Sequence, residues 1–276
     1  MVRAVIYSSV LPAIWNLTEL AQAEGITCVA VITHRTVRDA SGAERRNEIL
    51  SSAPEGLDLC FAADKGSLRR LTEAYEPDIG LCTGYPWRIP AEVLAVPPLG
   101  VLNSHPSLLP RHRGPFPFSW AIRENDPELG LTVHVMDEQF DTGPILAQGS
   151  RPMPEDMTLE GMRPTLRELS AEVFPKALRR VLSGDRGDPQ TDEGATYAGP
   201  FGEDYVELDP AKPRADLLRQ VNAWQLMFHQ PVPGPFAAVD GGRVRVLDAT
   251  LDEPPAGAVR LDAADGPLWL TAVERA

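Results

Sequence analysis

An amide and an imidazole lie two positions apart in the segment Asn103-Ser104-His105. They follow the apolar run Gly100-Val101-Leu102, which predicts a strand that ends at His105. Because side chains in a strand alternate between its faces, Asn103 and His105 are expected to project from the same face. A neutral amide donor beside an imidazole suits a reaction that develops negative charge on a carbonyl oxygen.

An acidic turn follows later in the chain, in the segment Met136-Asp137-Glu138-Gln139-Phe140-Asp141-Thr142-Gly143. If this turn folds back over the strand end, Asp141 can hydrogen-bond His105 and favour the protonated imidazole. Each residue alone has another explanation, since Asn and His cap turns and Asp before Thr-Gly can form an Asx turn. Their joint occurrence favours a catalytic trio of Asn103, His105 and Asp141.

Short apolar runs alternate with helical patterns through the N-terminal part of the chain. The runs predict strands at 2–7, 26–33, 79–83, 99–105 and, from its alternation, 131–136. Helices are expected at 12–24, 68–75 and 159–182, the last interrupted at Pro164 and Pro175. Apolar strands separated by helices are typical of a parallel sheet covered on both faces, in which ligands bind at the carboxyl ends of the strands.

The composition changes after Ser183, where a segment rich in Gly and Asp predicts a linker over 184–196. We therefore expect one domain over 1–183 and a smaller one over 197–276. The smaller domain is expected to hold one helix at 211–224, followed by short strands at 236–239, 244–247, 258–261 and 268–273. Short runs punctuated by Gly and Pro indicate a small β-rich domain, such as a barrel.

The overall composition is that of an ordinary globular protein, with 43% hydrophobic and 24% charged residues. No apolar run approaches the roughly 18 residues that a membrane helix needs. The opening segment superficially resembles a signal sequence but fits a buried strand and a helix entered through Pro12, so we expect a cytoplasmic protein. Cys28, Cys60 and Cys82 lie in apolar segments without metal-binding spacing, and the five histidines show none either, so no metal is expected.

These motifs resemble the folate-dependent formyltransferase superfamily. The resemblance covers residues 1–183 and is carried by Asn-x-His-Pro-Ser-Leu-Leu-Pro from Asn103, Arg-x-Arg-Gly from Arg111, and Met-Asp-Glu-x-x-Asp-Thr-Gly-Pro-Ile-Leu from Met136. The superfamily includes methionyl-tRNA formyltransferases, sugar and hydroxyornithine N-formyltransferases, and glycinamide ribonucleotide formyltransferases; the last lack a C-terminal domain and fit less well. The resemblance implies an α/β fold, with a Rossmann-like formyltransferase domain followed by a small β-rich, OB-like open barrel.

The same resemblance implies 10-formyltetrahydrofolate as the formyl donor and matches Asn103, His105 and Asp141 to the family's catalytic residues. The acceptor amine would attack the formyl carbon directly, through a tetrahedral intermediate and without a metal. The folate would contact two loops, through the residues Tyr85, Trp87, Arg88, Ile89, Pro90, Asp137, Glu138, Gln139 and Phe140. For Trp87 and Arg88 an ordinary surface loop is the alternative.

Two groups of residues near the motifs have roles that the sequence leaves open. His134 could approach the trio, but we expect a structural histidine. Arg111, His112 and Arg113 flank the catalytic loop and could meet an anionic acceptor, although solvated surface positions are expected for them.

The net charge of the chain indicates which class of acceptor it can bind. The chain carries a net charge of −13, and residues 197–276 contain twelve acidic and seven basic residues. Because nucleic-acid binding is driven by basic surface, this balance favours a small-molecule amine, such as an amino sugar or hydroxyornithine, over tRNA. Methionyl-tRNA stays the main alternative, since Arg35, Arg38, Arg45 and Arg46 form a local basic cluster. A hydrolase that releases formate, a non-catalytic folate-binding protein, and a homodimer role for the small domain also stay open.

Overall fold

The computed structural model describes residues 1–34, 40–227, 233–239 and 241–275, which form two compact units. The first unit consists of Met1–Arg111, Gly130–Ser150 and Leu166–Ala195; the second consists of His112–Leu129, Arg151–Thr165 and Thr196–Ala276. Because the units interleave along the chain, the domain boundaries expected at 183 and 197 stay a prediction. In the described part of the chain, no helix combines the length and apolarity needed to cross a membrane.

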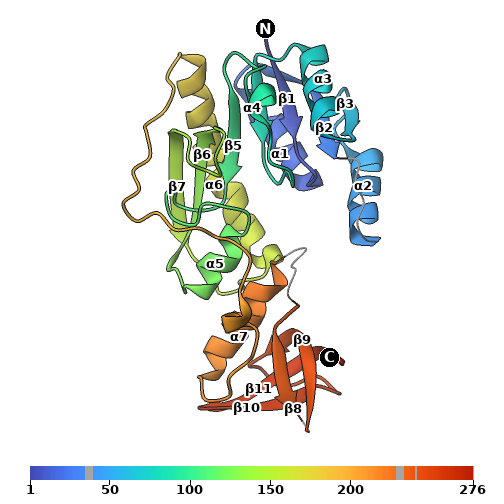
Figure 1. Cartoon of the computed structure of the whole chain (residues 1–276), viewed down its shortest axis with the longest axis vertical. Helices are drawn as coiled ribbons and strands as arrows, with labels where there is room; N and C mark the ends of the chain where they lie inside the picture. Colours follow the sequence, from blue (N-terminus) through green and yellow to red (C-terminus); the bar gives the residue numbers. More distant parts are fainter. Residues whose placement is uncertain (35–39, 228–232, 240, 276) are drawn as a thin grey trace. The chain divides into compact units, whose positions relative to one another are not determined.

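A seven-stranded sheet forms the first unit, in the order β3-β2-β1-β4-β5-β6-β7 (Figure 1). Its strands are β1 Val2–Tyr7, β2 Ile26–His34, β3 Asp58–Ala62, β4 Ile79–Cys82, β5 Val101–His105, β6 Glu128–Val135 and β7 Ile145–Pro152. Neighbours from β3 to β5 are parallel, whereas β6 runs antiparallel to β5. The strand order reverses between β1 and β4, which is where doubly wound sheets bind their ligands.

Five helices accompany this sheet: α1 Leu11–Ala23, α2 Ala40–Ser52, α3 Lys65–Tyr75, α4 Ala91–Leu94 and α6 Leu159–Leu182. The expected strands and helices of this region are confirmed, but β3, β7, α2 and α4 had no prediction. The interruption of α6 at Pro164 and Pro175 was wrong, because the helix runs through both prolines. Each proline removes one helical hydrogen bond, and the buried face of Leu169, Phe174 and Leu178 holds the helix together by packing.

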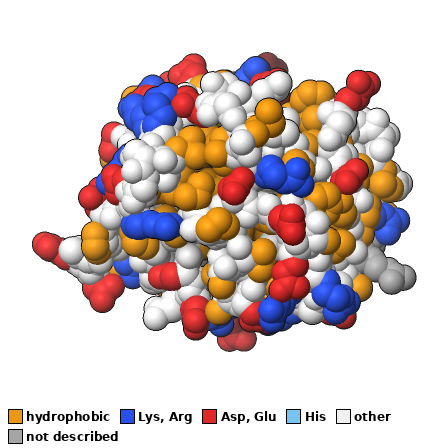
Figure 2. Space-filling view, turned by 90° about the horizontal axis from the view of Figure 1, so that it is seen from above, with side chains coloured by type: hydrophobic (Ala, Val, Ile, Leu, Met, Phe, Trp, Pro, Cys, Tyr) orange, Lys and Arg blue, Asp and Glu red, His pale blue; other side chains and the backbone are white. Residues whose placement is uncertain are grey.

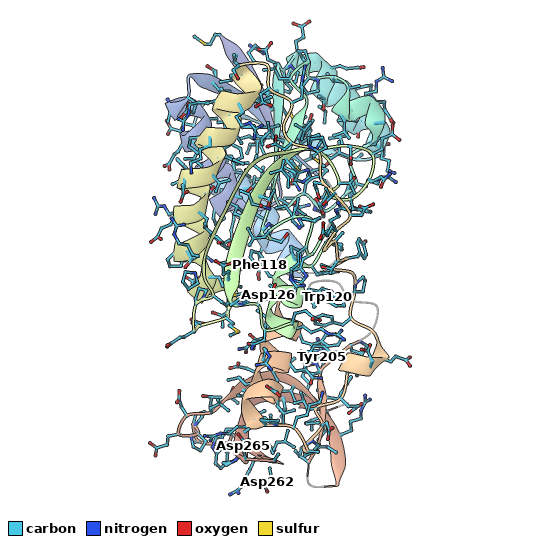
Figure 3. The ribbon with its side chains drawn as sticks, turned by 90° about the vertical axis from the view of Figure 1, so that its left-hand side faces the viewer. Phe118, Trp120, Asp126, Tyr205, Asp262 and Asp265 are labelled. Carbon is cyan, nitrogen blue, oxygen red and sulfur yellow. The ribbon has the colours of Figure 1, made fainter. Side chains whose placement is uncertain are left out.

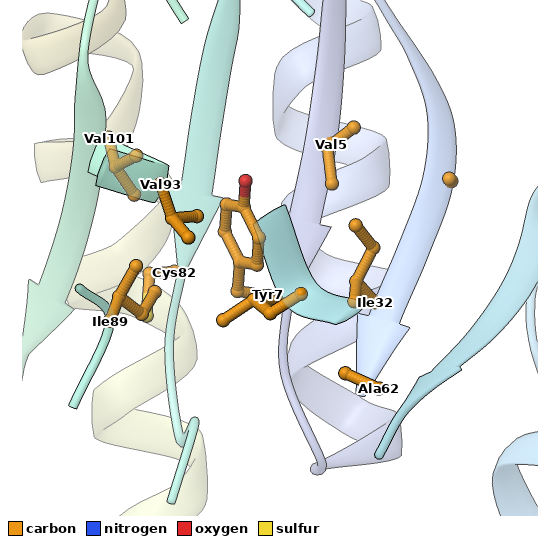
Figure 4. Packing of buried hydrophobic residues seen from close by; sticks show 10 residues of the cluster. Val5, Tyr7, Ile32, Ala62, Cys82, Ile89, Val93 and Val101 are labelled. Carbon is orange, nitrogen blue, oxygen red and sulfur yellow. The ribbon is translucent and has the colours of Figure 1, made fainter. Parts of the chain in front are cut away.

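Helices α3 and α4 cover one face of the sheet, and Tyr7 lies at the centre of the cluster between them and the strands (Figure 4). Its ring packs among side chains that include Ile32, Cys82 and Val93, and its hydroxyl hydrogen-bonds Thr72 Oγ1 at 2.9 Å. The odd residues of β1 thus face this cluster, and the even residues face the opposite side of the sheet. The sheet is therefore buried on both faces, as its continuous apolar strands predicted.

Burial of Cys82 makes the stability of the protein sensitive to alkaline pH. Burial raises the pKa of this thiol from 9.0 to about 12, with a smaller contribution from the charge of Asp141. The unfolded chain therefore loses the thiol proton near pH 9 while the folded chain keeps it. Stability contributed by the neutral thiol is complete below pH 9 and is lost as the pH rises toward 12, by up to about 1.4 kcal/mol per pH unit.

We expect urea unfolding to give a constant free energy from neutral pH to about pH 9 and a falling one above it. In Cys82→Ala the fall should become shallower, leaving the part that comes from Cys28, whose pKa burial also raises to about 12, and from the tyrosines whose pKa burial raises, which are Tyr7, Tyr75, Tyr85 and Tyr205. A slope identical in the two proteins would show that the Cys82 thiol does not contribute to it.

The second unit contains α5 Pro117–Arg123, α7 Arg214–Gln225 and a four-stranded antiparallel sheet in the order β10-β11-β9-β8. Its strands are β8 Phe236–Val239, β9 Gly242–Thr250, β10 Val259–Ala263 and β11 Gly266–Arg275. The edge strands β10 and β8 approach one another, so the sheet curls around a core that includes Leu217, Val221 and Leu268. This confirms the small β-rich domain. Its helix begins three residues later than expected, β8 has the expected bounds, and the other three strands are longer than expected.

An arginine packed among aromatic rings joins α5 to the segment before α7 within the second unit. Figure 3 labels Trp120 and Tyr205, two of the rings involved. The guanidinium of Arg123 lies 4.7 Å from the centroid of the Trp120 ring and 4.3 Å from that of Tyr205. It also pairs with Asp204 at 2.9 Å, and Trp120 Nε1 donates to the carbonyl of Gly199 at 2.7 Å. Cation–π contacts of this kind stabilise the packing of the arginine and satisfy its charge.

Candidate active site

The carboxyl end of β5 carries Asn103 and His105, with the imidazole buried and the amide half-buried. On one side, Asn103 stands beside Cys82 of the parallel strand β4. On the other side, the antiparallel register places Asn103 opposite His134 of β6 and His105 opposite Thr132. Asn103 therefore lies between two strands, in the last residue pair of β5 with β4 and two pairs before the end of β5 on the β6 side.

Asp141 lies at this strand end and contacts the side chains of Asn103, His105 and His134. Its Oδ1 accepts a hydrogen bond from Asn103 Nδ2 at 3.2 Å, and its Oδ2 lies 3.6 Å from His105 Nδ1. The side chain of Asp141 is 10% exposed, so its charge is only weakly screened by water. The acidic turn thus folds back over the strand end, as the sequence predicted, and brings Asn103, His105 and Asp141 together.

His134 belongs to the same cluster, although a purely structural histidine was expected. Its Nε2 lies 3.3 Å from both Asp141 Oδ1 and Asn103 Nδ2, while its Nδ1 lies 3.1 Å from the carbonyl of Val135. When Nδ1 donates to that carbonyl, Nε2 accepts from Asn103 in the neutral ring or donates to Asp141 in the protonated ring. The alternation of apolar and polar residues in the sequence of β6 was compatible with His134 approaching the trio. The antiparallel pairing of β6 with β5 is what places His134 opposite Asn103.

Thr132 and Gln148 fix the backbone that follows His105. The hydroxyl of Thr132 donates to the carbonyl of Ser107 at 2.7 Å and accepts from the amide of Leu109 at 3.2 Å. Gln148 Nε2 donates to the carbonyl of Leu109 at 2.9 Å and to Thr132 Oγ1 at 2.7 Å. The loop after β5 therefore has a defined path, which keeps the imidazole of His105 in place.

Two loops that were expected to contact folate meet beside this cluster. Arg88 donates to the backbone carbonyl of Glu138, and its guanidinium lies 6.0 Å from the centroid of the Phe140 ring. Phe140 is 48% exposed, so this contact leaves about half of the residue accessible to solvent. The structure therefore brings the loop over 84–90 and the loop over 137–141 together, as a shared binding site requires.

The residues of these loops differ in what they can offer a ligand. The side chain of Ile89 is buried in the sheet core, and Tyr85 and Trp87 pack against that core, so their backbone is the part that can face a bound ring. Pro90 precedes the first turn of α4. In the acidic turn, Asp137 rather than Asp141 forms an Asx-type turn, accepting from the amide of Gln139 at 3.0 Å; Glu138 and Gln139 are exposed.

Nucleophilic catalysis by a thiol does not fit this site. Cys82 is the cysteine nearest the cluster in the sheet, but burial and the charge of Asp141 raise its pKa to about 12, which keeps the thiol protonated at neutral pH. Within the described ranges, no three His, Cys, Asp or Glu side chains are grouped in a way that could hold a metal ion. The cluster offers a substrate an amide, two imidazoles and a carboxylate.

Comparison with known proteins agrees with this arrangement. The family described as Formyl transferase matches residues 6–178, which span β1 to α6 and include every residue of the cluster. The chain belongs to the formyl transferase family. The resemblance drawn from the motifs is therefore confirmed.

Similar members of the formyl transferase family include the methionyl-tRNA formyltransferase of Myxococcus xanthus, 38% identical over 173 residues, which are 62% of this chain and 54% of that protein. The methionyl-tRNA formyltransferase of Roseiflexus sp. is 33% identical over 205 residues, 72% of this chain and 61% of that protein. The chain therefore spans about half to three fifths of the length of these curated relatives.

One solved structure shares the fold over nearly the whole chain. HypX from Aquifex aeolicus, crystallised in complex with tetrahydrofolic acid, aligns with a TM-score of 0.71 at 19% identity. The alignment covers 99% of this chain and 44% of HypX. The likeness shows that the Rossmann-like sheet and the curled C-terminal sheet occur together in another protein.

The expected surface position of His112 was wrong. Its side chain is buried in the second unit, where Nε2 lies 2.7 Å from Asp126 Oδ2, and its backbone amide donates to Thr196 Oγ1 at 2.8 Å. The neighbouring Arg111 and Arg113 are half-buried. Arg35 and Arg38 of the basic cluster lie outside the described residues, as does the side chain of Arg45.

Proposed function

We propose that this member of the formyl transferase family moves a formyl group from 10-formyltetrahydrofolate to the amine of a small-molecule acceptor. The observation that supports the proposal is the contact of one buried carboxylate, Asp141, with Asn103, His105 and His134. A pure binding protein has no need for these groups together. The donor site would be formed by the loops that Arg88 joins to Glu138 and Phe140.

The proposed reaction proceeds in two steps. The lone pair of the acceptor amine forms a bond to the formyl carbon, and the carbonyl π electrons move to oxygen. Asn103 Nδ2 and the Nε2–H of protonated His105 donate hydrogen bonds to this oxyanion. The intermediate then collapses, the bond from the formyl carbon to the folate nitrogen breaks, and the proton of the amine passes to that nitrogen through the His105–Asp141 pair.

The charge of the second unit supports a small acceptor over tRNA. Four arginines of this unit pair with carboxylates beside them, in the pairs Arg219–Asp216, Arg243–Glu207, Arg245–Glu274 and Arg260–Asp262. On the face of the molecule drawn in Figure 2, Lys and Arg side chains are scattered among Asp and Glu and do not gather into one basic strip. Phosphate binding depends on such basic surface, so an amino sugar or a hydroxyornithine-like amine suits this protein better.

Methionyl-tRNA is the second candidate, because curated relatives of this chain are methionyl-tRNA formyltransferases. The catalytic cluster suits both acceptors equally, since either one presents an amine to the formyl carbon. The choice between a small amine and methionyl-tRNA therefore depends on the protein surface that would bind the acceptor beyond its amine.

A spectroscopic turnover assay with 10-formyltetrahydrofolate tests the proposal. The acceptor panel contains nucleotide-linked amino sugars, hydroxyornithine and methionyl-tRNA, and we expect formylation of one small amine that is absent in His105→Ala. Formylation of methionyl-tRNA alone would establish the second candidate. Formate release in the absence of any acceptor would indicate a hydrolase, and folate binding without turnover would indicate a binding protein.

A further inference from the structure

The segment after α6, which was expected to be a linker over 184–196, runs beside the loop that carries Asp141. The backbone of Asp188 pairs with that of Ile145 at the start of β7, through hydrogen bonds of 2.8 and 2.9 Å in the two directions. Gly187 has a positive φ of 86°, and a Cβ there would lie 2.8 Å from the carbonyl oxygen of Ile145. The close approach of the two backbones therefore requires glycine at this position.

Arg180 of α6 anchors the same segment. Its guanidinium donates to the carboxylates of Asp185 at 2.6 Å and Asp188 at 2.9 Å, and to the carbonyl of Leu146 at 2.9 Å. The Arg180 side chain thus contacts both segments that pair at Asp188 and Ile145: the segment after α6, and β7. These exposed contacts are individually weak, but together they define the path of residues 185–190.

Gln190, at the end of this path, reaches the loop of Asp141 directly. Its Nε2 donates to the backbone carbonyls of Asp141 at 2.9 Å and of Gly143 at 2.8 Å. The backbone of this loop is constrained at two positions. Asp141 has a positive φ of 55°. Gly143 packs so closely against β6 that a Cβ there would lie 1.8 Å from the carbonyl oxygen of Val135. A non-glycine residue in the left-handed region persists where its surroundings hold it there.

We infer that Gln190 is a positioning residue for Asp141, and that residues 185–190 act as a strap that holds the catalytic carboxylate against His105. The inference rests on the proposed function, since it gives Asp141 its role in formyl transfer. By clamping two carbonyls on either side of Thr142, one amide group fixes both the position and the direction of the carboxylate. Small displacements of such a group are costly, because a shift of about 1 Å can lower a rate about 10²-fold.

The chain offers a matched control for this clamp. Gln225 of α7 is half-buried like Gln190, and its Nε2 also has two acceptors, the carbonyl of Leu247 and Asp248 Oδ1, each at 3.0 Å. It lies in the second unit, so Gln225→Ala removes an equivalent pair of hydrogen bonds away from the cluster. Gln190→Glu is a size-matched variant that replaces the donor by a carboxylate facing two carbonyl oxygens.

Titration of the His105 ring by NMR, in protein with labelled histidine, reads the position of Asp141 without needing the acceptor. Titratable groups that face this ring and its partner include Asp141, His134 and the Cys82 thiol. Because a nearby carboxylate favours the protonated ring, Gln190→Ala should lower the pH midpoint of His105 toward that of Asp141→Asn, whereas Gln190→Glu adds a negative charge of its own and is compared by turnover alone. Turnover of 10-formyltetrahydrofolate should fall about 10- to 100-fold in the same variants, while Gln225→Ala leaves both unchanged.

The midpoints of His105 in these variants test the strap and the proposed formyl transfer independently. A midpoint lowered by Asp141→Asn but unchanged in Gln190→Ala would overturn the strap alone. A midpoint that does not respond even to Asp141→Asn would overturn the coupling of His105 to Asp141, and with it both the proposed mechanism and the strap. Melting temperatures of the Gln190 and Gln225 variants check that any difference does not come from loss of stability.

Discussion

Replacing Asn103 or His105 by alanine is expected to lower kcat for formyl transfer by about 10² to 10³-fold in each case. Both side chains project from the carboxyl end of β5, and both contact the same carboxylate. We assign them the hydrogen bonds to the oxyanion, which form fully only in the transition state. Their loss should therefore reduce kcat and leave the affinity for folate nearly unchanged.

Ser104→Ala is the matched control for this pair of variants. Ser104 lies between the two residues on β5, and strand alternation directs its side chain to the opposite face. The control should retain the turnover of the unmodified protein, which would show that β5 tolerates a substitution. Single-turnover rates measured with saturating 10-formyltetrahydrofolate separate chemistry from release, and full activity in Asn103→Ala would remove the amide from the mechanism.

The second large effect is expected for Asp141→Asn, with a fall in kcat of about 10² to 10⁴-fold. The substitution keeps the size of the side chain but removes the charge that favours protonated His105. It also leaves one acceptor oxygen where the carboxylate had two, so the new amide can accept from Asn103 Nδ2 or from His105 Nδ1 but presents an NH₂ group to the other. The cluster then holds one donor too many, and one of these two side chains loses the acceptor that orients it.

The pH dependence of kcat distinguishes these two consequences. If Asp141 acts by keeping His105 protonated, the residual activity of Asp141→Asn should rise as the pH is lowered toward the range where the imidazole protonates by itself. If Asp141 acts only by orienting Asn103, lowering the pH should recover nothing. Activity equal to that of the unmodified protein at neutral pH would contradict both roles.

The sequence alone predicted that Asn103, His105 and Asp141 act together, and the structure places their side chains in contact. Spacing of two residues on a strand put Asn103 and His105 on one face, and the specific motif around Asp141 linked the acidic turn to that strand end. The same local periodicities gave the strands β1, β2, β4 and β5 and the small β-rich domain, because hydrophobic alternation and helical spacing are properties of neighbouring residues. Family membership follows from these motifs too.

Two residues distant in the sequence, His134 and Gln190, could be placed beside the trio only from the three-dimensional structure. His134 faces Asn103 because β6 pairs antiparallel with β5 in one register, and a shift of one residue would turn its ring to the other face. Gln190 reaches the loop of Asp141 because Asp188 pairs with Ile145, although its own sequence is typical of a linker. Strand register and contacts between distant segments depend on how whole elements pack, so patterns within a short window do not contain them.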